Sequence, residues 1–319
     1  MPELTQGDQA LYLLFGGLAV LLAIASAIGW VLARRATTPQ SIDTVRNLVD
    51  RINAWWVMVA VLAAAFLLGR TVTLVVFGLM AYFALREFVT LTPTRDGDRL
   101  PLSLAFFVIL PAQFVLIGIE RYGMFAIFVP VYAFLLLPAI AAMRGDVQDF
   151  LTRTAKLQWG LMITVYCLSH APALLLLDIP GFGGREALLL FYLLFVVQIS
   201  DVMQYVFGKL LGKTKIAPVV SPSKTVEGFV GGALAATAFG AAMWWITPFT
   251  PLESAAMAAA IVIMGFLGGL TLSAVKRSLG AKDWGVMIEG HGGMLDRLDS
   301  VCFAAPVFFH LTRFFHSAA

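Results

Sequence analysis

Charged side chains gather in one stretch of the C-terminal third of this chain, between long apolar segments. Aspartate oxygens can hold Mg²⁺, and lysine and arginine can neutralise phosphates. A Gly-Gly turn allows backbone amides to approach an anion closely. Charge at this density beside lipid is unfavourable unless it binds a charged ligand, so the stretch predicts a metal–phosphate site at a membrane surface. Its candidate residues are Lys276, Arg277, Lys282, Asp283, His291, Gly292, Gly293, Asp296, Arg297 and Asp299.

A further acid lies inside an apolar segment upstream of this stretch. The helix expected over 186–208 places Gln198, Asp201 and Tyr205 on one face. An acid within such a helix is a candidate functional residue. The structural alternative pairs Asp201 with Lys209 or with a neighbouring serine, and the sequence leaves both interpretations open.

The loop after this helix offers groups that suit an anion. Ser221 before Pro222 is typical of a helix N-cap followed by the first helical residue. The first turn would then present free amides, the hydroxyls of Ser223 and Thr225, and the Lys224 ammonium. This arrangement favours a phosphate contact, whereas the alternative is an ordinary capped helix with Lys224 reaching the membrane surface.

Glycines in two segments are expected to let helices approach one another closely. Gly228 and Gly232 are four residues apart, and Gly265, Gly268 and Gly269 follow in the next apolar segment. Such small residues are typical of helix contacts inside membranes. We therefore expect these positions to be packing residues rather than ligands.

The composition is that of a membrane protein. Of the 319 residues 60% are hydrophobic and 13% are charged, against about 25% charged residues in a soluble domain. The chain is therefore predicted to be an all-α, polytopic helical bundle with about ten transmembrane helices in a single membrane domain, 1–319. Residues 1–185 form its N-terminal helices, and 186–319 form a catalytic half with loops 209–225 and 274–299. The predicted spans are 11–33, 54–69, 71–85, 102–119, 123–142, 157–178, 186–208, 228–246, 253–273 and 300–315.

Two features of the N-terminal part are less regular. The segments 54–69 and 71–85 are short for a span of about 20 residues, so 54–85 forms either two spans or one long bent helix. The sequence favours two spans because this count keeps the basic loops on one side. The polar stretch 34–53 has apolar residues near one helical face and is expected to be a short helix on the membrane surface.

The basic residues predict an orientation. With the N-terminus outside, all of the 22 lysines and arginines fall in inside loops except Arg70, Arg121, Arg185 and Arg313. The positive-inside rule favours this arrangement. It places the charged C-terminal stretch on the cytoplasmic side, and we expect an integral protein of a bacterial inner membrane.

These motifs resemble those of the phosphatidate cytidylyltransferases, also called CDP-diglyceride synthetases. That family has Ser, two residues on Lys-Arg, then Lys-Asp, His-Gly-Gly and Asp-Arg-x-Asp, and the stretch from Ser273 to Asp299 contains every element. The family's Ser-Pro-x-Lys-Thr-x-Glu-Gly segment is similar to residues 221–228. One position departs, because Glu289 stands where the family usually has Pro or Gly. Glu87 resembles an acid of the family's N-terminal half, although with Arg86 it indicates a pair at a helix end.

The resemblance implies that CTP and phosphatidate react to give CDP-diacylglycerol and pyrophosphate among membrane lipids. It implies bound Mg²⁺, and it leaves a second cation and a homo-oligomer open. The implied metal ligands are Asp283, Asp296 and Asp299, with Asp201 either as a further ligand or as a residue that supports the ligands. The implied catalytic and phosphate-binding residues are Ser221, Ser223, Lys224, Thr225, Lys276, Arg277, Lys282, His291, Gly292, Gly293 and Arg297.

Two other function classes stay open at this point. A CTP-dependent lipid kinase of the polyprenol or phytol type would share the membrane site and the metal, but would transfer the γ-phosphate to an alcohol. A cation transporter would require charges near mid-membrane in several helices, whereas here they gather in loops. The net charge of +3 is too small to favour nucleic acid as a partner.

Overall fold

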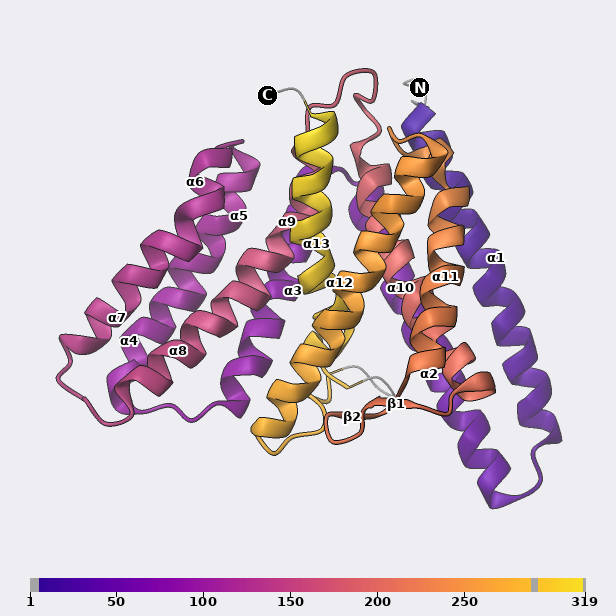
Figure 1. The fold of residues 1–319 in the computed structure, drawn as a ribbon, viewed down its shortest axis with the longest axis horizontal. Coiled ribbons are helices and arrows are strands. Elements are labelled where there is room, and N and C mark those ends of the chain that lie inside the picture. The colour runs from indigo at the N-terminus through magenta and orange to yellow at the C-terminus, as the bar shows by residue number, and fades with distance from the viewer. Residues whose placement is uncertain (1–5, 288–291, 318–319) are drawn as a thin grey trace.

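The chain crosses the membrane as a bundle of helices that run alternately up and down in the computed structural model (Figure 1), which describes residues 6–287 and 292–317. Within these residues nine helical stretches are long and apolar enough to span, and one shorter apolar helix completes the set. The polytopic all-α prediction is therefore confirmed. Nearly every backbone group of a span must bond within the chain, and a helix satisfies this requirement locally.

The elements follow the predicted segments closely. The first three helices are α1 (Gln6–Arg35), α2 (Pro39–Leu67) and α3 (Arg70–Leu91). Three interrupted spans come next: η1 (Asp96–Asp98), α4 (Arg99–Leu104), η2 (Ala105–Ile109) and α5 (Leu110–Gly118); α6 (Tyr122–Ile127), η3 (Phe128–Ala133) and α7 (Phe134–Ala142); α8 (Phe150–Leu161), η4 (Met162–Cys167), α9 (Leu168–Ala173) and η5 (Leu174–Leu176). The remaining helices are α10 (Glu186–Leu211), α11 (Val226–Ala242), η6 (Trp244–Ile246), α12 (Pro251–Ser278) and α13 (Leu295–His316).

The region 54–85 forms two spans, as the sequence favoured. Gly69, at φ 95°, separates α2 from α3 and adopts a conformation that suits glycine. The surface helix expected over 34–53 is wrong as a separate element. Thr38 caps α2 and Pro39 is its first residue, so the polar stretch is the first half of one helix of 29 residues. The charged residues in the first half of α2 interrupt the apolar run, so the sequence did not predict one continuous helix.

The basic loops share one edge of the molecule. In Figure 1 the α1–α2 turn, the β-hairpin and the end of α12 lie along the lower edge, while the start of α1 and the end of α13 lie at the upper edge. Alternation of the spans also brings the connections α3–α4 and α7–α8 to the lower edge. We call this edge the basic face and the other the far face.

A short β-hairpin replaces the helix start expected at Ser221. Strands β1 (Lys215–Ala217) and β2 (Ser221–Thr225) pair antiparallel. The N-cap prediction for Ser221 is therefore wrong, and Thr225 caps α11 instead by accepting a hydrogen bond from Gly228 N at 3.1 Å. Pro222 fits a short strand at a sheet edge as well as a first helical turn, because neither position needs its missing N–H.

Glycines bring α10, α11, α12 and α13 together, as predicted. A Cβ atom on Gly232 would lie 2.5 Å from Gln204 N, and one on Gly228 would lie 2.8 Å from Gly208 Cα. A Cβ on Gly268 would lie 2.6 Å from Asp299 O. No side chain fits at these crossings, so the small residues set the helix spacing in this half of the bundle.

Candidate active site

Two carboxylates from distant helices share one serine hydroxyl. Ser300 Oγ donates to Asp201 Oδ2 at 3.3 Å and lies 3.4 Å from Asp299 Oδ1. The backbone N–H of Ser300 also donates to Asp299 Oδ1 at 2.7 Å. Asp201 comes from α10 and Asp299 from the first turns of α13, so the packing of these helices creates the pair. The sequence allowed Asp201 to pair with Lys209 or with a serine, and in the structure it pairs with Ser300.

Lys224 brings a positive charge to this pair. A Cβ atom on Gly269 of α12 would lie 3.0 Å from Lys224 Nζ and 3.7 Å from Asp299 Oδ2. The bare backbone of Gly269 therefore leaves room for the ammonium beside the carboxylate, a role beyond the packing that the sequence predicted. Burial lowers the pKa of Lys224 from its usual value, while the carboxylates of Asp299 and Asp201 act in the opposite direction.

A cavity of about 390 Å³ opens beside this cluster between α10, α11 and α12. This volume is within the range of small-molecule sites, about 300–1,000 Å³. Asp201 is exposed to it, and the rings of Phe229 and Phe266 form an apolar wall. The other polar lining includes Lys209, Lys215, Ser223, Lys224 and Thr225. Two of these lysines, Lys209 and Lys215, were not among the predicted site residues, because each looked like an ordinary basic loop residue.

Asp296 belongs to a separate cluster. Its Oδ1 forms an ion pair with Lys276 Nζ at 2.5 Å, and its Oδ2 accepts hydrogen bonds from Trp284 N at 2.8 Å and Gly293 N at 2.9 Å. Both side chains are largely buried, with 11% of Lys276 and 6% of Asp296 exposed. Asp296 thus ties the end of α12 to the loop before α13, and its oxygens are occupied by protein donors.

The four predicted metal ligands do not form one set. Among the residues that the structure describes, no three Asp, Glu, His or Cys side chains come together as a metal-binding group. Asp201 and Asp299 form one pair, Asp296 bonds to Lys276, and Asp283 is exposed. Mg²⁺ is commonly held by one or two carboxylates with substrate phosphates and water completing its shell. The pair beside Lys224 therefore fits Mg²⁺ better than the original four-residue set.

The other predicted residues are spread over the same face. Lys282 and Arg277 are exposed, and Arg277 donates to Ala281 O at 3.0 Å. Gly292, at φ 83°, needs to be glycine because a Cβ would lie 2.8 Å from Asp296 Oδ2. Ser221 begins β2 and is absent from the cavity lining, and Arg297 follows Asp296 in α13. His291 and Glu289 lie outside the described residues.

Glu87 is a site residue whose role the sequence did not reveal. Its carboxylate, on α3, accepts hydrogen bonds from Met294 N and Leu295 N, each at 2.8 Å. These amides belong to the start of α13, which has free N–H groups and favours a negative charge. The helix-end pair with Arg86 is wrong, because Glu87 bonds across 207 residues of sequence. The only signal in the sequence was an acid at the end of an apolar helix.

An aromatic contact holds the same loop to α3. Trp284 is 2% exposed, and its ring stacks on Phe88 with centroids 5.4 Å apart. A Cβ atom on Gly285 would lie 2.9 Å from Glu87 Oε1. Glu87, Phe88 and Trp284 therefore fix the loop between α12 and α13 against the N-terminal half of the bundle.

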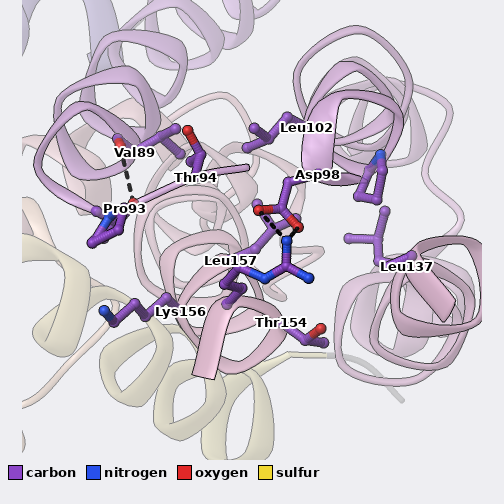
Figure 2. Close-up of a pocket in the computed structure, with 13 residues that line it drawn as sticks. Val89, Pro93, Thr94, Asp98, Leu102, Leu137, Thr154, Lys156 and Leu157 are labelled. Carbon is purple, nitrogen blue, oxygen red and sulfur yellow. Dashed lines mark hydrogen bonds and ion pairs between the residues drawn. The ribbon is translucent and has the colours of Figure 1, made fainter. Parts of the chain in front are cut away.

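A second polar cluster on the basic face is structural. Arg153 is almost fully buried and pairs with Asp98 Oδ1 at 3.2 Å and with Asp146 Oδ2 at 3.1 Å. Figure 2 shows Asp98, Thr154 and Lys156 around the adjoining cavity, whose volume is about 20 Å³. That volume holds about one water molecule. The cluster therefore joins the starts of the α4 and α8 spans, and it has no room for a nucleotide.

The helical bundle, with its carboxylate–lysine cluster beside a cavity, has the features of an integral membrane enzyme that acts on phosphates. A model of the cytidylyltransferase family matches residues 49–315, so the chain belongs to that family and is a nucleotidyltransferase. This assignment excludes the transporter interpretation. It also confirms the resemblance that the sequence motifs indicated.

Relatives of two kinds match this chain. The uncharacterized protein YnbB of Escherichia coli strain K12 is 37% identical over 268 residues, which cover 83% of this chain and 87% of that protein. The phosphatidate cytidylyltransferase of Staphylococcus aureus strain COL is 29% identical over 249 residues, covering 75% of this chain and 89% of that enzyme. A phosphatidate cytidylyltransferase of Staphylococcus saprophyticus is 41% identical over 131 residues, which cover 37% of this chain and 47% of that enzyme.

Proposed function

We propose that this enzyme transfers CMP from CTP to phosphatidate, giving CDP-diacylglycerol and pyrophosphate. The observation that carries the proposal is that Asp201 and Lys224 line the 390 Å³ cavity, while Asp299 lies beside them and shares the Ser300 hydroxyl with Asp201. The names of the staphylococcal relatives support phosphatidate as the acceptor. The apolar wall of Phe229 and Phe266 suits a lipid substrate that enters from the bilayer.

The reaction brings two anions together. A phosphate oxygen of phosphatidate attacks the α-phosphorus of CTP, the new P–O bond forms, and the bond to the β-phosphate breaks as pyrophosphate leaves. Phosphatidate is already a nucleophile, so the protein has to neutralise and align charge rather than remove a proton. Lys224, Lys209 and Lys215 lie where they can neutralise phosphates at the cavity wall.

The carboxylate pair suits a magnesium ion. Asp201 and Asp299 would hold it from two helices, and the Ser300 hydroxyl fixes their spacing. A magnesium ion held there would supply positive charge that stabilises the pyrophosphate leaving group. Asp296 is not part of this proposed ligand set. Its role is to hold Lys276 and the loop before α13 in place.

Isotope placement tests this assignment against the lipid-kinase alternative. Purified protein receives phosphatidate, Mg²⁺ and CTP that is labelled at either the α or the γ phosphorus. We expect the α label to enter lipid and the γ label to be released in pyrophosphate. A kinase would put the γ label into lipid and release CDP, and this result would overturn the proposal. Transfer of the α label to another acidic phospholipid, with none to phosphatidate, would change the substrate.

We propose that the enzyme lies in the inner membrane with its basic face toward the cytoplasm. CTP is available on that side. Single cysteines replacing Lys213 or Ala281 should then be shielded from a membrane-impermeant thiol reagent in intact spheroplasts, whereas a cysteine at Gly183 should react. Lys213 lies just before the β-hairpin, and Ala281 lies in the loop after α12. Gly183 lies between η5 and α10. Outside labelling at Lys213 would reverse the orientation.

A further inference from the structure

A second cavity lies at the far face, away from the proposed active site. Its volume is about 290 Å³, close to the lower end of small-molecule sites, about 300 Å³. The α5–α6 turn, the end of the α8–α9 span and the last turns of α13 surround it. The C-terminal end of α13 and the α5–α6 turn both lie toward the upper edge of Figure 1, opposite the β-hairpin.

Basic residues of the far face concentrate at this cavity. Only four of the 22 lysines and arginines belong to this face, and Arg121 and Arg313 line the cavity. A third, Arg70, bonds to the lining residue Glu120 at 2.8 Å and neutralises it. Within the described residues no ion pair engages the guanidinium of Arg121 or Arg313. Two arginines without an ion pair in the described part of the chain therefore line the same cavity, where Asp178 is the one acid not paired with Arg70.

The cavity is apolar beneath these cations. Ile117, Phe125 and Phe309 line it and are buried, with 2%, 2% and 3% of their surfaces exposed. Arg313 stands over the ring of Tyr122 at 3.7 Å, which fixes the guanidinium at the cavity wall. A cationic rim above an apolar floor matches a molecule with a phosphate at one end and hydrocarbon at the other.

We propose that this cavity binds the phosphate of an anionic glycerophospholipid in the leaflet opposite the active site. Arg121 and Arg313 contact the phosphate, and the acyl chains begin on the floor of Phe125 and Phe309. Asp178 also lines the cavity, and its negative charge moderates the affinity. The site depends on neither CTP nor the carboxylate pair, so it stands apart from the proposed reaction.

Binding of dioleoylphosphatidylglycerol to the purified full-length protein tests the proposal. Native mass spectrometry gives its apparent affinity, with dioleoylphosphatidylcholine as the lipid of equal chain length and no net charge. We expect phosphatidylglycerol to bind more tightly, and R121Q/R313Q to weaken it by at least about tenfold, since each residue makes a charged contact. Asp178→Asn should tighten binding. Arg185→Gln is the matched control, because Arg185 is the far-face arginine that neither lines the cavity nor bonds to its lining.

Several outcomes would overturn the site. They are equal binding of the two lipids, unchanged affinity in the double variant, and an equal loss in Arg185→Gln. Displacement of the lipid by excess inorganic phosphate would indicate a free-phosphate site instead. Should the double variant fail to fold, Arg121→Gln alone decides, because Arg121 is exposed and forms no ion pair within the described residues. Weaker binding of phosphatidylglycerol in Asp178→Asn would also contradict the proposal, because loss of a negative charge beside a bound phosphate should tighten binding.

Discussion

Replacing Asp299 with asparagine should lower turnover by at least about 100-fold, because a carboxylate that holds Mg²⁺ contributes several kcal/mol to stabilisation of the transition state. Asparagine keeps the shape of the side chain and can still accept the hydrogen bond from Ser300 N. It removes the negative charge beside Lys224 and the proposed metal ligand. The measurement is transfer of the α label of CTP into lipid by purified protein.

Asp96→Asn serves as the control for this change. Asp96 is an acid of the same face whose side chain is 90% exposed and pairs with Arg99 at 2.9 Å. Its variant should keep normal turnover, since exposed ion pairs contribute little to stability. A folded Asp299→Asn enzyme with normal turnover would remove Asp299 from the site.

A glycine variant disturbs the same site without changing any charge. In Gly269→Ala the new methyl group would lie 3.0 Å from Lys224 Nζ, so the flexible ammonium has to move. In Gly265→Ala the nearest atom is Ser300 Cβ at 3.5 Å, an ordinary contact. Both variants should fold, and Gly269→Ala alone should lose turnover. Equal activity of the two would argue against a role for Lys224 at this position.

Replacing Glu87 with alanine should lower both turnover and thermal stability. The start of α13 would lose two hydrogen bonds to a charged acceptor, and each such bond contributes about 1.5–3 kcal/mol. The turn that carries Asp296 and Asp299 would then shift, and a displacement of about 1 Å can reduce a rate by about 100-fold. We expect at least a tenfold loss in turnover, about 1.4 kcal/mol.

Hydrogen exchange separates this positioning role from a general loss of fold. In Glu87→Ala the amides of Met294 and Leu295 should exchange faster, while Glu87→Gln keeps one acceptor oxygen and should be intermediate. Arg86→Gln is the matched control, because Arg86 is the exposed neighbour on α3. Normal turnover in Glu87→Ala, or unchanged exchange at both amides, would show that Glu87 does not position the site.

Much of the architecture followed from local properties of the chain. Hydrophobic length identifies a span without knowledge of its neighbours, so the polytopic helical bundle was predicted correctly. The side of the membrane on which the basic loops lie stays a prediction. The first half of α2 was missed because its charges break the apolar run, although Thr38 and Pro39 mark its start. The helix-packing glycines were also predictable, since close contact requires a small residue whatever its partner is.

The tertiary structure decided which charged groups meet. Asp201 and Ser300 are 99 residues apart, and Glu87 and Met294 are 207 apart. The residues adjacent in sequence to Asp201 or Glu87 do not indicate which distant residue each one contacts. Asp296 and Asp299 look equivalent in sequence, yet a separation of three residues on α13 turns Asp296 toward Lys276 and Asp299 toward Lys224. The residue types were readable from the sequence, but their roles depend on helix packing, because an ionic contact forms only where the fold brings two groups within a few ångströms.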